Sequence, residues 1–566
     1  MIGPGRKLVQ AYLSQRGFKR AAPRAAGATA FRGTLPCRGH LVPIQLEIED
    51  WNFVAYPRIF VLQRPPILDG YRPHIGLGQQ LCYLSKGEEY LDVYDPASMI
   101  KNCLEQAESV LHDISGNTNK IDRAGEFLVN WRPEEAALIA DDVASVTTKS
   151  DFFGLTVISP PKKQFACLLI GKDPSQLSTQ LQSIGYHGPK QYLKNCLVLR
   201  IEVPPCFDPD HWPPATFADL LHWLKKLDEK AYKTLVRHLE SDWILRHEFS
   251  SVLFVSPVGR FGCTFTFALP KNLSEKYFLR HPADLRQRIF KTASTIKIVR
   301  FGCMEITPEF IHGRNQGKEG TLAGLKITLV GCGTIGGYLA TYLARLGAGA
   351  NGGELVLIDS DELSPSNLGR HVLSMKHLFS PKAEALAEHL REEFPHLKVT
   401  PRPVDVLSVG KLFECGLVID ATGEEAVSTV INQRHVNRRD RGSPPVLYAW
   451  VEGQGYAVRT LLVDSAKAMC YQCQYIRSGG ERRERIPILR DPSADHKRQL
   501  ADCENFTPFP VSASVNAAAL ALEAVMDWRR KKTGNRFRAR RLSEQHTENR
   551  RDSSPDRLDS CVACGS

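Results

Sequence analysis

The chain has 566 residues, of which 43% are hydrophobic, 24% are charged and 8% are aromatic. Single hydrophobic cores stop growing at about 250 to 300 residues, so this length predicts about three domains. The composition is typical of a soluble globular protein, most of which folds. No apolar run approaches the roughly 20 residues that cross a bilayer, so we expect a cytoplasmic protein with no membrane partner.

The net charge is +11, and much of the excess lies between residues 529 and 541. A basic surface can bind nucleic acid by releasing counterions, but a local basic run is more often a solvated linker. We therefore expect no nucleic-acid partner. In a reducing compartment, the fifteen cysteines are expected to be core residues, metal ligands or nucleophiles rather than disulfides.

Residues 1–125 have the pattern of a small α+β domain. An amphipathic helix pattern opens the segment, and strand-like runs follow at VPIQLEIED (42–50) and PRIFVLQRPP (57–66). A second helix pattern covers 97–114. The segment therefore predicts a helix, a meander of strands and a helix.

Residues 126–310 contain a helical stretch at 217–239 between short strand patterns, which lie at 164–171, 196–203, 250–258 and 263–270. No catalytic constellation is visible in this segment. We interpret it as a central α+β linker domain that positions the other domains or forms an interface.

Residues 311–566 alternate strand and helix patterns as far as about 528. The strand patterns are KITLVG (326–331), ELVLID (354–359), KVTPRPVD (398–405) and LVIDATG (417–423). This alternation predicts a parallel, doubly wound α/β sheet of the Rossmann-like type. The charged stretch 529–560 is expected to be a flexible basic insert.

A glycine-rich turn follows the first of these strands. The strand runs into Gly331, Gly333 and Gly336, spaced as GxGxxG, and then into a helix. Glycines permit the tight turn and let backbone N–H groups approach a phosphate at the positive end of the helix. The next strand ends in Asp359, where an acidic residue can bind a ribose hydroxyl. Taken alone, this pattern favours NAD or FAD, so an NAD oxidoreductase is one alternative.

The residues that follow Asp359 differ from those of a dehydrogenase. They include Asn367 and Arg370 in the run SNLGR, and then Lys382. Two cations beside a nucleotide are useful when a triphosphate is neutralised and pyrophosphate is expelled. The segment resembles the adenylating domain of the ubiquitin-activating, ThiF and MoeB family. The resemblance implies that ATP binds here, that Asp359 binds the ribose, and that Asn367, Arg370 and Lys382 contact the phosphates.

One departure from that family concerns the magnesium ligand. The family places a second Asp after its fourth strand to hold Mg²⁺, whereas this chain has Gly423 there, between Asp420 and Glu424. Either carboxylate can carry the ion, because Mg²⁺ often needs only one or two besides phosphate oxygens. Asp420 alternatively does no more than end the strand. The family also implies a homodimer, in which Arg314 reaches the partner's site.

Two CxxC pairs, Cys470 with Cys473 and Cys561 with Cys564, frame the last part of the chain. Each pair can present two thiolates to one ion, and two pairs complete a tetrahedral site with no open position. The spacing therefore predicts a structural Zn²⁺ site, an arrangement that the family often has. A redox CxxC needs no second pair.

Cys503 lies between these pairs, just before the helical run SASVNAAALALEAVMDW. In the family, a cysteine at this place accepts the activated acyl group as a thioester. A helix N-terminus or a cation lowers a thiol pKa, whereas the neighbouring Asp502 and Glu504 would raise it. A bystander role for Cys503 therefore stays open beside the nucleophilic one.

The N-terminal segment contains a second possible acceptor, Cys82. The run YPRIFVLQRPP, then His74 and then Cys82, resembles the ubiquitin-conjugating domain, in which a proline-rich turn precedes His-Pro-Asn-Ile and a catalytic Cys. His74 stands where that family has Asn, at the same interval from the cysteine. The resemblance implies that Cys82 is the transfer cysteine and that His74 stabilises the oxyanion, unless His74 is merely structural.

A conjugating domain followed by an activating domain resembles the bacterial fusion enzymes of anti-phage CBASS operons. The resemblance implies that the C-terminal carboxylate of a cyclic-nucleotide synthase, or of a ubiquitin-like protein, is adenylated and relayed through Cys503 and Cys82 to a target lysine. A sulfur-carrier-protein adenylyltransferase and a non-catalytic nucleotide-binding scaffold are the alternatives.

Overall fold

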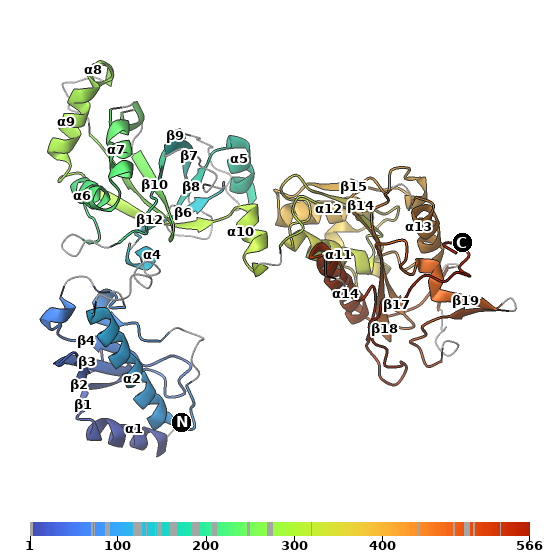
Figure 1. Ribbon diagram of the computed structural model, residues 1–566, viewed down its shortest axis with the longest axis horizontal. Helices are drawn as coiled ribbons and strands as arrows, with labels where there is room; N and C mark the ends of the chain where they lie inside the picture. The colour runs from blue at the N-terminus through green and yellow to red at the C-terminus, as the bar shows by residue number, and fades with distance from the viewer. Residues whose placement is uncertain are drawn as a thin grey trace. The chain divides into compact units, whose positions relative to one another are not determined.

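The computed structural model describes most of the chain (Figure 1). The described residues are 4–69, 72, 74–84, 91–116, 127–131, 133–141, 143, 150–158, 167–183, 193–206, 212–240, 242–245, 250–268, 275–317, 320–438, 442–478, 481–491, 499–501, 504–532 and 534–565. The chain divides into two compact units, 1–177 with 188–304, and 178–187 with 305–566.

The N-terminal part is an antiparallel sheet in the order β1-β2-β3-β4-β5 with two helices. Its elements are α1 (Pro4–Gln15), β1 (Lys19–Ala21), β2 (Thr29–Cys37), β3 (His40–Ile48), β4 (Arg58–Val61), η1 (Pro66–Leu68), η2 (Leu77–Gln79), β5 (Gln80–Leu81) and α2 (Pro96–Ser115). The apolar face of α2, with Ile100, Leu104 and Leu111, shares one core with Leu35 and Leu46 of the sheet. This is the predicted helix–meander–helix arrangement.

The central part closes seven strands into a barrel, in the order β10-β11-β12-β6-β8-β7-β9. Its elements are α4 (Phe127–Asn130), β6 (Glu135–Ile139), β7 (Ser150–Ile158), β8 (Cys167–Gly171), α5 (Pro174–Ser183), β9 (Leu193–Arg200), α6 (Phe217–Leu227), α7 (Glu229–His238), η4 (Asp242–Ile244), β10 (Ser250–Ser256), β11 (Gly259–Phe265), α8 (Glu275–Arg280), α9 (Pro282–Thr292) and β12 (Ile298–Glu305). Aromatic residues fill one side of its core, where the rings of Phe127 and Phe261 lie 4.8 Å apart.

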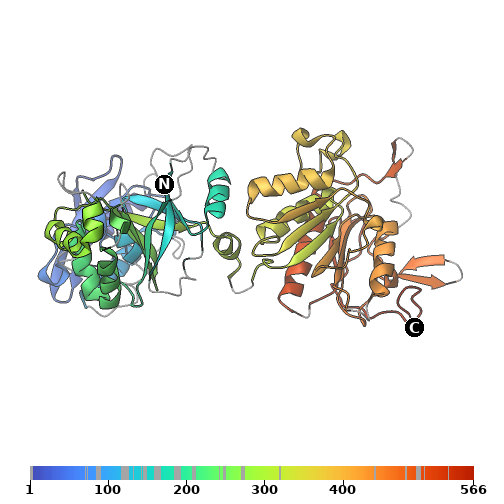
Figure 2. The ribbon, with the colours of Figure 1, turned by 90° about the horizontal axis from the view of Figure 1, so that it is seen from above.

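The C-terminal part is a seven-stranded sheet in the order β15-β14-β13-β16-β17-β18-β23, with helices on both sides (Figure 2). The strands are β13 (Lys326–Val330), β14 (Glu354–Ile358), β15 (Val399–Arg402), β16 (Leu417–Asp420), β17 (Val446–Glu452), β18 (Ala457–Val463) and β23 (Phe537–Arg541). The helices are α10 (Pro308–Gly313), α11 (Thr334–Arg345), α12 (Lys382–Glu393), α13 (Glu425–Val436) and α14 (Val511–Arg529), with short turns η6 (Pro365–Asn367), η7 (Met375–His377), η8 (Val406–Ser408) and η10 (Tyr471–Gln474).

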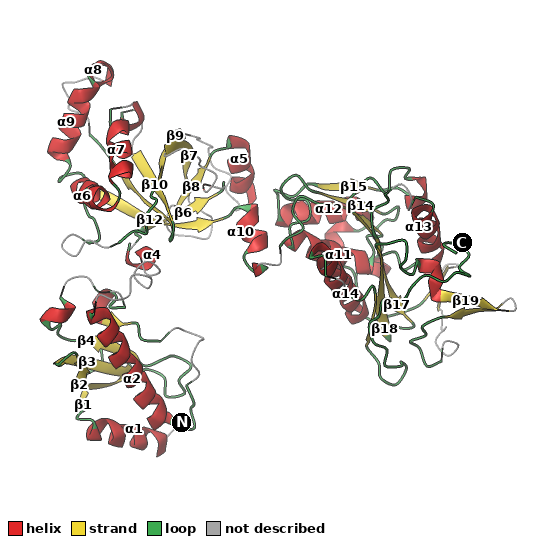
Figure 3. Ribbon diagram, viewed as in Figure 1, coloured by secondary structure: helices red, strands yellow, loops and turns green. Residues whose placement is uncertain are grey.

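The first five strands of this sheet are parallel. Alternate residues of one strand enter two different cores: Leu329 packs in the cluster that contains α11 and α14, and Val330 packs in the cluster that contains Ile431 of α13. The two clusters therefore lie on opposite faces of the sheet. Figure 3 shows α11 and α14 on one side of the strands and α13 on the other. This confirms the predicted doubly wound α/β fold.

The stretch 529–560 differs from the prediction of a flexible insert. Within its described residues, β23 pairs antiparallel with β18, from Leu461 opposite Phe537 to Ala457 opposite Arg541. Its arginines pair with acidic residues, as Arg536 does with Asp464 at 2.5 Å and Arg538 does with Asp527 at 2.7 Å. The prediction is wrong for this strand, because β18, which is distant in sequence, supplies the ladder and both near and distant carboxylates supply the counter-charges.

Two short hairpins complete the C-terminal unit, β19 (Tyr475–Ser478) with β20 (Glu481–Glu484) and β21 (Gln499–Ala501) with β22 (Glu504–Phe506). In the part of the chain that the structure describes, no helix has both the length and the apolar character needed to cross a membrane.

Candidate functional site

A cavity of about 710 Å³ opens at the carboxyl ends of β13, β14 and β16. These strands meet where the strand order reverses, because β13 lies between β14 and β16. Doubly wound sheets bind their ligands at such a point. The wall includes the predicted residues Gly331, Gly333, Asp359, Asn367, Arg370 and Lys382, together with Glu424 and Phe509.

The glycine turn has no room for side chains at two of its positions. Gly331 has φ +86°, and a Cβ on Gly336 would lie 1.8 Å from the Gly331 carbonyl oxygen. Gly333 caps the start of α11 without a side-chain hydrogen bond. The first N–H groups of the helix therefore point at the cavity with no side chain competing for them, as a phosphate site requires.

The carboxylate of Asp359 holds this turn in place by hydrogen bonds. One carboxylate oxygen accepts from the Cys332 N–H at 2.6 Å and the other accepts from the Asp361 N–H at 2.8 Å. Burial raises the pKa of Asp359 above its usual value, although both hydrogen bonds oppose the shift. The residue lies at the cavity wall as the sequence predicted, and its remaining lone pairs are available to a hydroxyl group.

Arg370 lies in the cavity wall with its guanidinium 4.7 Å from the centre of the Phe509 ring. Its Nε is buried without a hydrogen-bond partner, and no carboxylate among the described residues pairs with it. Burial lowers the pKa of Arg370. A half-buried cation that faces a cavity without a counter-charge is suited to an anionic ligand.

Lys382 begins α12 and is buried, with its Nζ donating to Asp361 Oδ2 at 2.8 Å. Asn367 accepts from the Ser364 N–H at 3.0 Å through its side-chain oxygen, so its amide N–H₂ group is left to donate. Both side chains line the same cavity as Arg370. The fold therefore brings together, in one cavity wall, the three residues that the resemblance implied as phosphate contacts.

Sequence reasoning missed His371, which ties the glycine turn to the segment that carries Arg370. Its Nδ1 accepts from the Leu373 N–H at 3.0 Å, so the proton lies on Nε2, which donates to the Cys332 carbonyl oxygen at 2.7 Å. Burial lowers the pKa of His371 and keeps the ring neutral. No sequence pattern distinguishes this histidine from a surface residue.

Asp420 and Glu424 differ in their availability to a metal ion. Asp420 is fully buried, and its oxygens accept hydrogen bonds from the Thr422 hydroxyl at 2.7 Å and the Ser428 hydroxyl at 2.6 Å. Glu424 lines the cavity, and burial together with the carboxylates of Asp361 and Asp359 raises its pKa. A divalent cation would relieve this repulsion, so the geometry favours Glu424 over Asp420.

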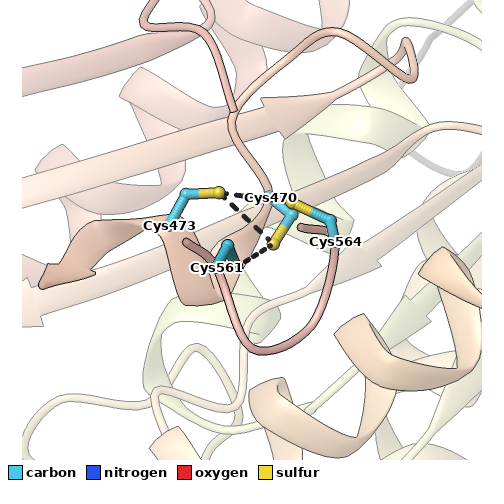
Figure 4. A group of neighbouring side chains, drawn as sticks. All are labelled: Cys470, Cys473, Cys561 and Cys564. Atoms are coloured by element: carbon cyan, nitrogen blue, oxygen red, sulfur yellow. Dashed lines mark hydrogen bonds between the residues drawn. The ribbon is translucent and has the colours of Figure 1, made fainter. Parts of the chain in front are cut away.

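The four paired cysteines converge (Figure 4). The sulfur atoms of Cys470, Cys473, Cys561 and Cys564 all lie within 4.8 Å of one another, and neighbouring pairs are 3.4 to 3.8 Å apart. The amide of Asn432 donates to Cys470 at 3.6 Å. Four buried thiols with such N–H donors fit a tetrahedral Zn²⁺ ion, whose charge stabilises thiolates.

Cys82 directly follows β5 in the N-terminal part and is exposed, whereas its neighbours Leu81 and Tyr83 are buried. The Tyr83 hydroxyl donates to the Pro57 carbonyl at 2.5 Å, which fixes the chain just beyond the thiol. The backbone N–H of Cys82 donates to the His74 carbonyl at 2.7 Å. The backbones of the two predicted residues are therefore hydrogen-bonded across the loop that joins them.

Two other predicted residues cannot be placed in the cavity of their own chain. Cys503 lies outside the described residues. Arg314, at the end of α10, is exposed and stacks against Phe310 with its guanidinium 5.5 Å from the ring centre. It does not line the cavity.

The fold and this site define an adenylating domain of the ThiF type that is joined to a ubiquitin-conjugating-like domain. The sequence profile of the ThiF family matches residues 311–562, and that of the prokaryotic E2 family B matches residues 11–139.

The chain is 31% identical over 563 residues to the ATP-dependent ubiquitin transferase-like protein Cap2 of Pseudomonas aeruginosa, covering 98% of this chain and 97% of that protein. It is 29% identical over 523 residues to the Escherichia coli protein of the same name, covering 86% and 85%. A crystal structure of E. coli MccB with MccA-N7isoASN matches with a TM-score of 0.36 and 21% identity, covering 52% of this chain and 83% of that one.

The chain therefore belongs to the Cap2 family of ATP-dependent ubiquitin transferase-like proteins, a bacterial fusion of the kind found in CBASS operons. It is an enzyme of ATP-dependent activation and conjugation, and its ThiF-type domain binds ATP.

Proposed function

We propose that the C-terminal carboxylate of a substrate protein is adenylated in the cavity and then passed through Cys503 and Cys82 to a lysine amine. One observation carries this proposal. Arg370 lies half-buried in the cavity wall with no carboxylate partner among the described residues, beside the open helix start at Gly333 and the amide of Asn367. This is a site for a polyphosphate next to a position that an acid group can reach.

In the first step, a carboxylate oxygen of the tail attacks the α-phosphorus of ATP. A P–O bond forms, the bond to the β-phosphate breaks, and pyrophosphate leaves. Arg370 and Asn367 hold the phosphates, and Lys382 exchanges Asp361 for a phosphate oxygen as negative charge develops. Glu424, with Asp361, would hold Mg²⁺, which neutralises charge on the leaving pyrophosphate.

In the second step, the Cys503 thiolate attacks the carbonyl carbon of the acyl adenylate and AMP leaves. The Cys82 thiolate then takes the acyl group and Cys503 is released. Finally a lysine amine attacks the Cys82 thioester, an amide forms, and the Cys82 thiol leaves. The exposure of Cys82 supports its role, because both exchange steps need an accessible sulfur.

We propose that His74 donates a hydrogen bond to the oxyanion formed at Cys82. The backbone hydrogen bond between the two residues supports this role, since it holds the backbone of His74 next to that of Cys82. His74 also has φ +62°, a conformation that costs energy in a non-glycine residue and often occurs at functional positions.

The substrate that we favour is the C-terminal tail of a CBASS cyclic-nucleotide synthase, and a ubiquitin-like protein is the second choice. The support is the membership of the Cap2 family, together with a cavity whose inner wall is a glycine turn. Such a wall accommodates a tail that ends in small residues. A homodimer is part of the same proposal, because Arg314 is exposed and free to reach a second subunit.

Intact-mass measurement tests the relay. The chain is incubated with Mg²⁺, ATP and a purified cyclic-nucleotide synthase, with and without thiol. We expect a thiol-labile adduct on the wild type, an adduct confined to Cys503 in C82A, and released pyrophosphate without stable adduct in C503A. If the protein were a sulfur-carrier activator, the C82A variant would have the same activity as the wild type. If it were a non-catalytic scaffold, no tail would cause pyrophosphate release.

A further inference from the structure

The turn that leads to Cys82 has an unusual backbone. His74, Gly78 and Gln79 all have left-handed φ values, of +62°, +69° and +68°. Two of these three are not glycine, and each then costs about 1 kcal/mol or more relative to an extended or helical conformation. Such a turn persists only where its surroundings hold it in place.

Hydrogen bonds within the turn connect its tip to the thiol. The Gly76 N–H donates to the Gln80 carbonyl at 2.8 Å, and the Cys82 N–H donates to the His74 carbonyl at 2.7 Å. Cys82 is therefore held by the turn as well as by the sheet, in which β5 pairs with β4 just before it.

Arg24 holds the tip of the turn from the segment between β1 and β2. Its guanidinium donates to the Gly78 carbonyl at 2.7 Å and lies 4.3 Å from the centre of the Phe60 ring. Its backbone N–H donates to Glu47 Oε1 at 2.6 Å. The residue is thus fixed at both ends, one on the sheet and the other on the turn.

Glu47 can hold the backbone of Arg24 in a fixed position, because the Glu47 side chain has no exposure to solvent. A buried carboxylate must be hydrogen-bonded, and the amide of Gln45 donates to the same oxygen at 2.6 Å. Gln45 in turn accepts from Arg32 Nε at 2.8 Å and donates to the Ala22 carbonyl at 3.1 Å. This network lies on one face of the sheet, on β2 and β3, and the side chain of Arg24 is its extension to the turn.

Arg64 supports the turn from the segment that follows β4. Its Nε donates to Gln79 Oε1 at 2.7 Å. Two arginines from different segments therefore donate hydrogen bonds to the successive residues Gly78 and Gln79. Both of these residues have a left-handed backbone conformation.

We propose that Arg24, assisted by Arg64, is a positioning residue for Cys82: it fixes the turn 74–82 so that the sulfur is presented for acyl transfer. The inference rests on the proposed role of Cys82 as an acyl carrier. It also gives the hydrogen-bond network around the buried Glu47 a role in the reaction, namely to hold Arg24 in place.

The test loads Cys82 without ATP. The full chain is mixed with a peptide thioester of 2-mercaptoethanesulfonate; the Cys82 thiolate attacks the thioester carbonyl and the small thiol leaves. Discharge to free lysine then forms an amide and returns the Cys82 thiol. Peptide mapping separates Cys82 from Cys206, the other exposed thiol among the described residues.

We expect R24A to lower the rate constant of discharge about tenfold, the effect of one lost hydrogen bond on a strained turn, with an unchanged half-saturating lysine concentration. R24K keeps a donor and should recover part of the rate. Hydrogen exchange of the peptide that contains Gly76 and Cys82 should quicken five- to tenfold in R24A and R64A. R32A is the matched control, because Arg32 belongs to the same network but does not reach the turn.

The inference is overturned if R24A transfers the acyl group to lysine at the wild-type rate. It is also overturned if R32A slows this transfer equally, because Arg24 would then act only by stabilising the sheet. Exchange of the β2 and β3 amides shows whether each variant keeps its fold. A wild-type chain that takes no acyl group on Cys82 would instead contradict the proposed function, so the two failures are distinguishable.

Discussion

At the scale of single residues, Arg370 is the side chain on which the proposed adenylation would depend most. It is held in place by the face of Phe509 rather than by an acid, so its charge is available to the first anion that enters the cavity. A guanidinium that pairs with a carboxylate would have to exchange partners before binding phosphate.

Replacing Arg370 with Ala should therefore lower kcat/KM in tail-dependent ATP–pyrophosphate exchange by about 100- to 1000-fold. Arg438 is the matched control, because its guanidinium also stacks on a phenylalanine, 5.6 Å from the Phe413 ring, but does not line the cavity. R438A should keep full exchange activity. Normal exchange in R370A would mean that the phosphates bind elsewhere.

Glu424 and Asp420 should respond differently to loss of charge. E424Q should raise the Mg²⁺ concentration for half-maximal pyrophosphate release about tenfold with an unchanged melting temperature, because Glu424 faces the cavity. D420N should lower the free energy of unfolding by about 1 to 3 kcal/mol, because Asp420 accepts hydrogen bonds from Thr422 and Ser428 in the core. A Mg²⁺ requirement that shifts only in D420N would reverse this assignment.

At the scale of elements, two histidines join α10 to the segment between α12 and β15. His312 Nδ1 donates to the Arg345 carbonyl at 3.0 Å, so its Nε2 accepts from His396 Nε2 at 2.8 Å. Burial and the facing His312 lower the pKa of His396 to about 4, and burial lowers that of His312 as well. Both rings are therefore neutral in the folded protein near neutral pH.

The unfolded chain should bind protons on these rings near pH 6.5, well before the folded chain does. The free energy of unfolding should consequently fall as the pH drops from about 6.5 to about 4, by roughly 1 to 2 kcal/mol after allowance for the partial exposure of His396. H396N should flatten this dependence in denaturant titrations, whereas H389N, on the surface of α12, should leave it in place. An equal pH dependence in H396N would contradict the pairing.

Elements also show how far the sequence could be interpreted. The strand that ends at Asp359 and the turn at Gly331 were predictable, because short-range periodicity and glycine spacing encode them. The closure of the central barrel and the pairing of β23 with β18 were not, since strand partners far apart in sequence decide them. The same holds around the site, because neither the ring of Phe509 beside Arg370 nor the hydrogen bonds to Asp420 in the core could be predicted from a local sequence pattern.

At the scale of the whole molecule, the four cysteines connect η10 to the C-terminal residues 561–564 across about ninety positions of the chain. A bound Zn²⁺ ion would stabilise the C-terminal unit, because the unfolded chain cannot offer four converging thiolates. We expect one zinc per chain by metal analysis. C564S should lose this zinc and lower the melting temperature by roughly 10 °C.

Cys415 provides the control for that experiment, since its partly buried thiol donates to the Leu412 carbonyl and lies outside the cluster. C415S should retain zinc and melt close to the wild type. Full zinc content in C564S would show that the metal binds at another site.

The central claim joins two parts of the chain: ATP activates a carboxylate in the C-terminal part, and a sulfur in the N-terminal part receives it. The most direct measurement follows oxygen from a cyclic-nucleotide synthase whose C-terminal carboxyl carries oxygen-18. Attack of that carboxylate on the α-phosphorus predicts that the released AMP contains one labelled atom while the product amide keeps the other. Release of unlabelled AMP, or of ADP with phosphate, would contradict adenylation.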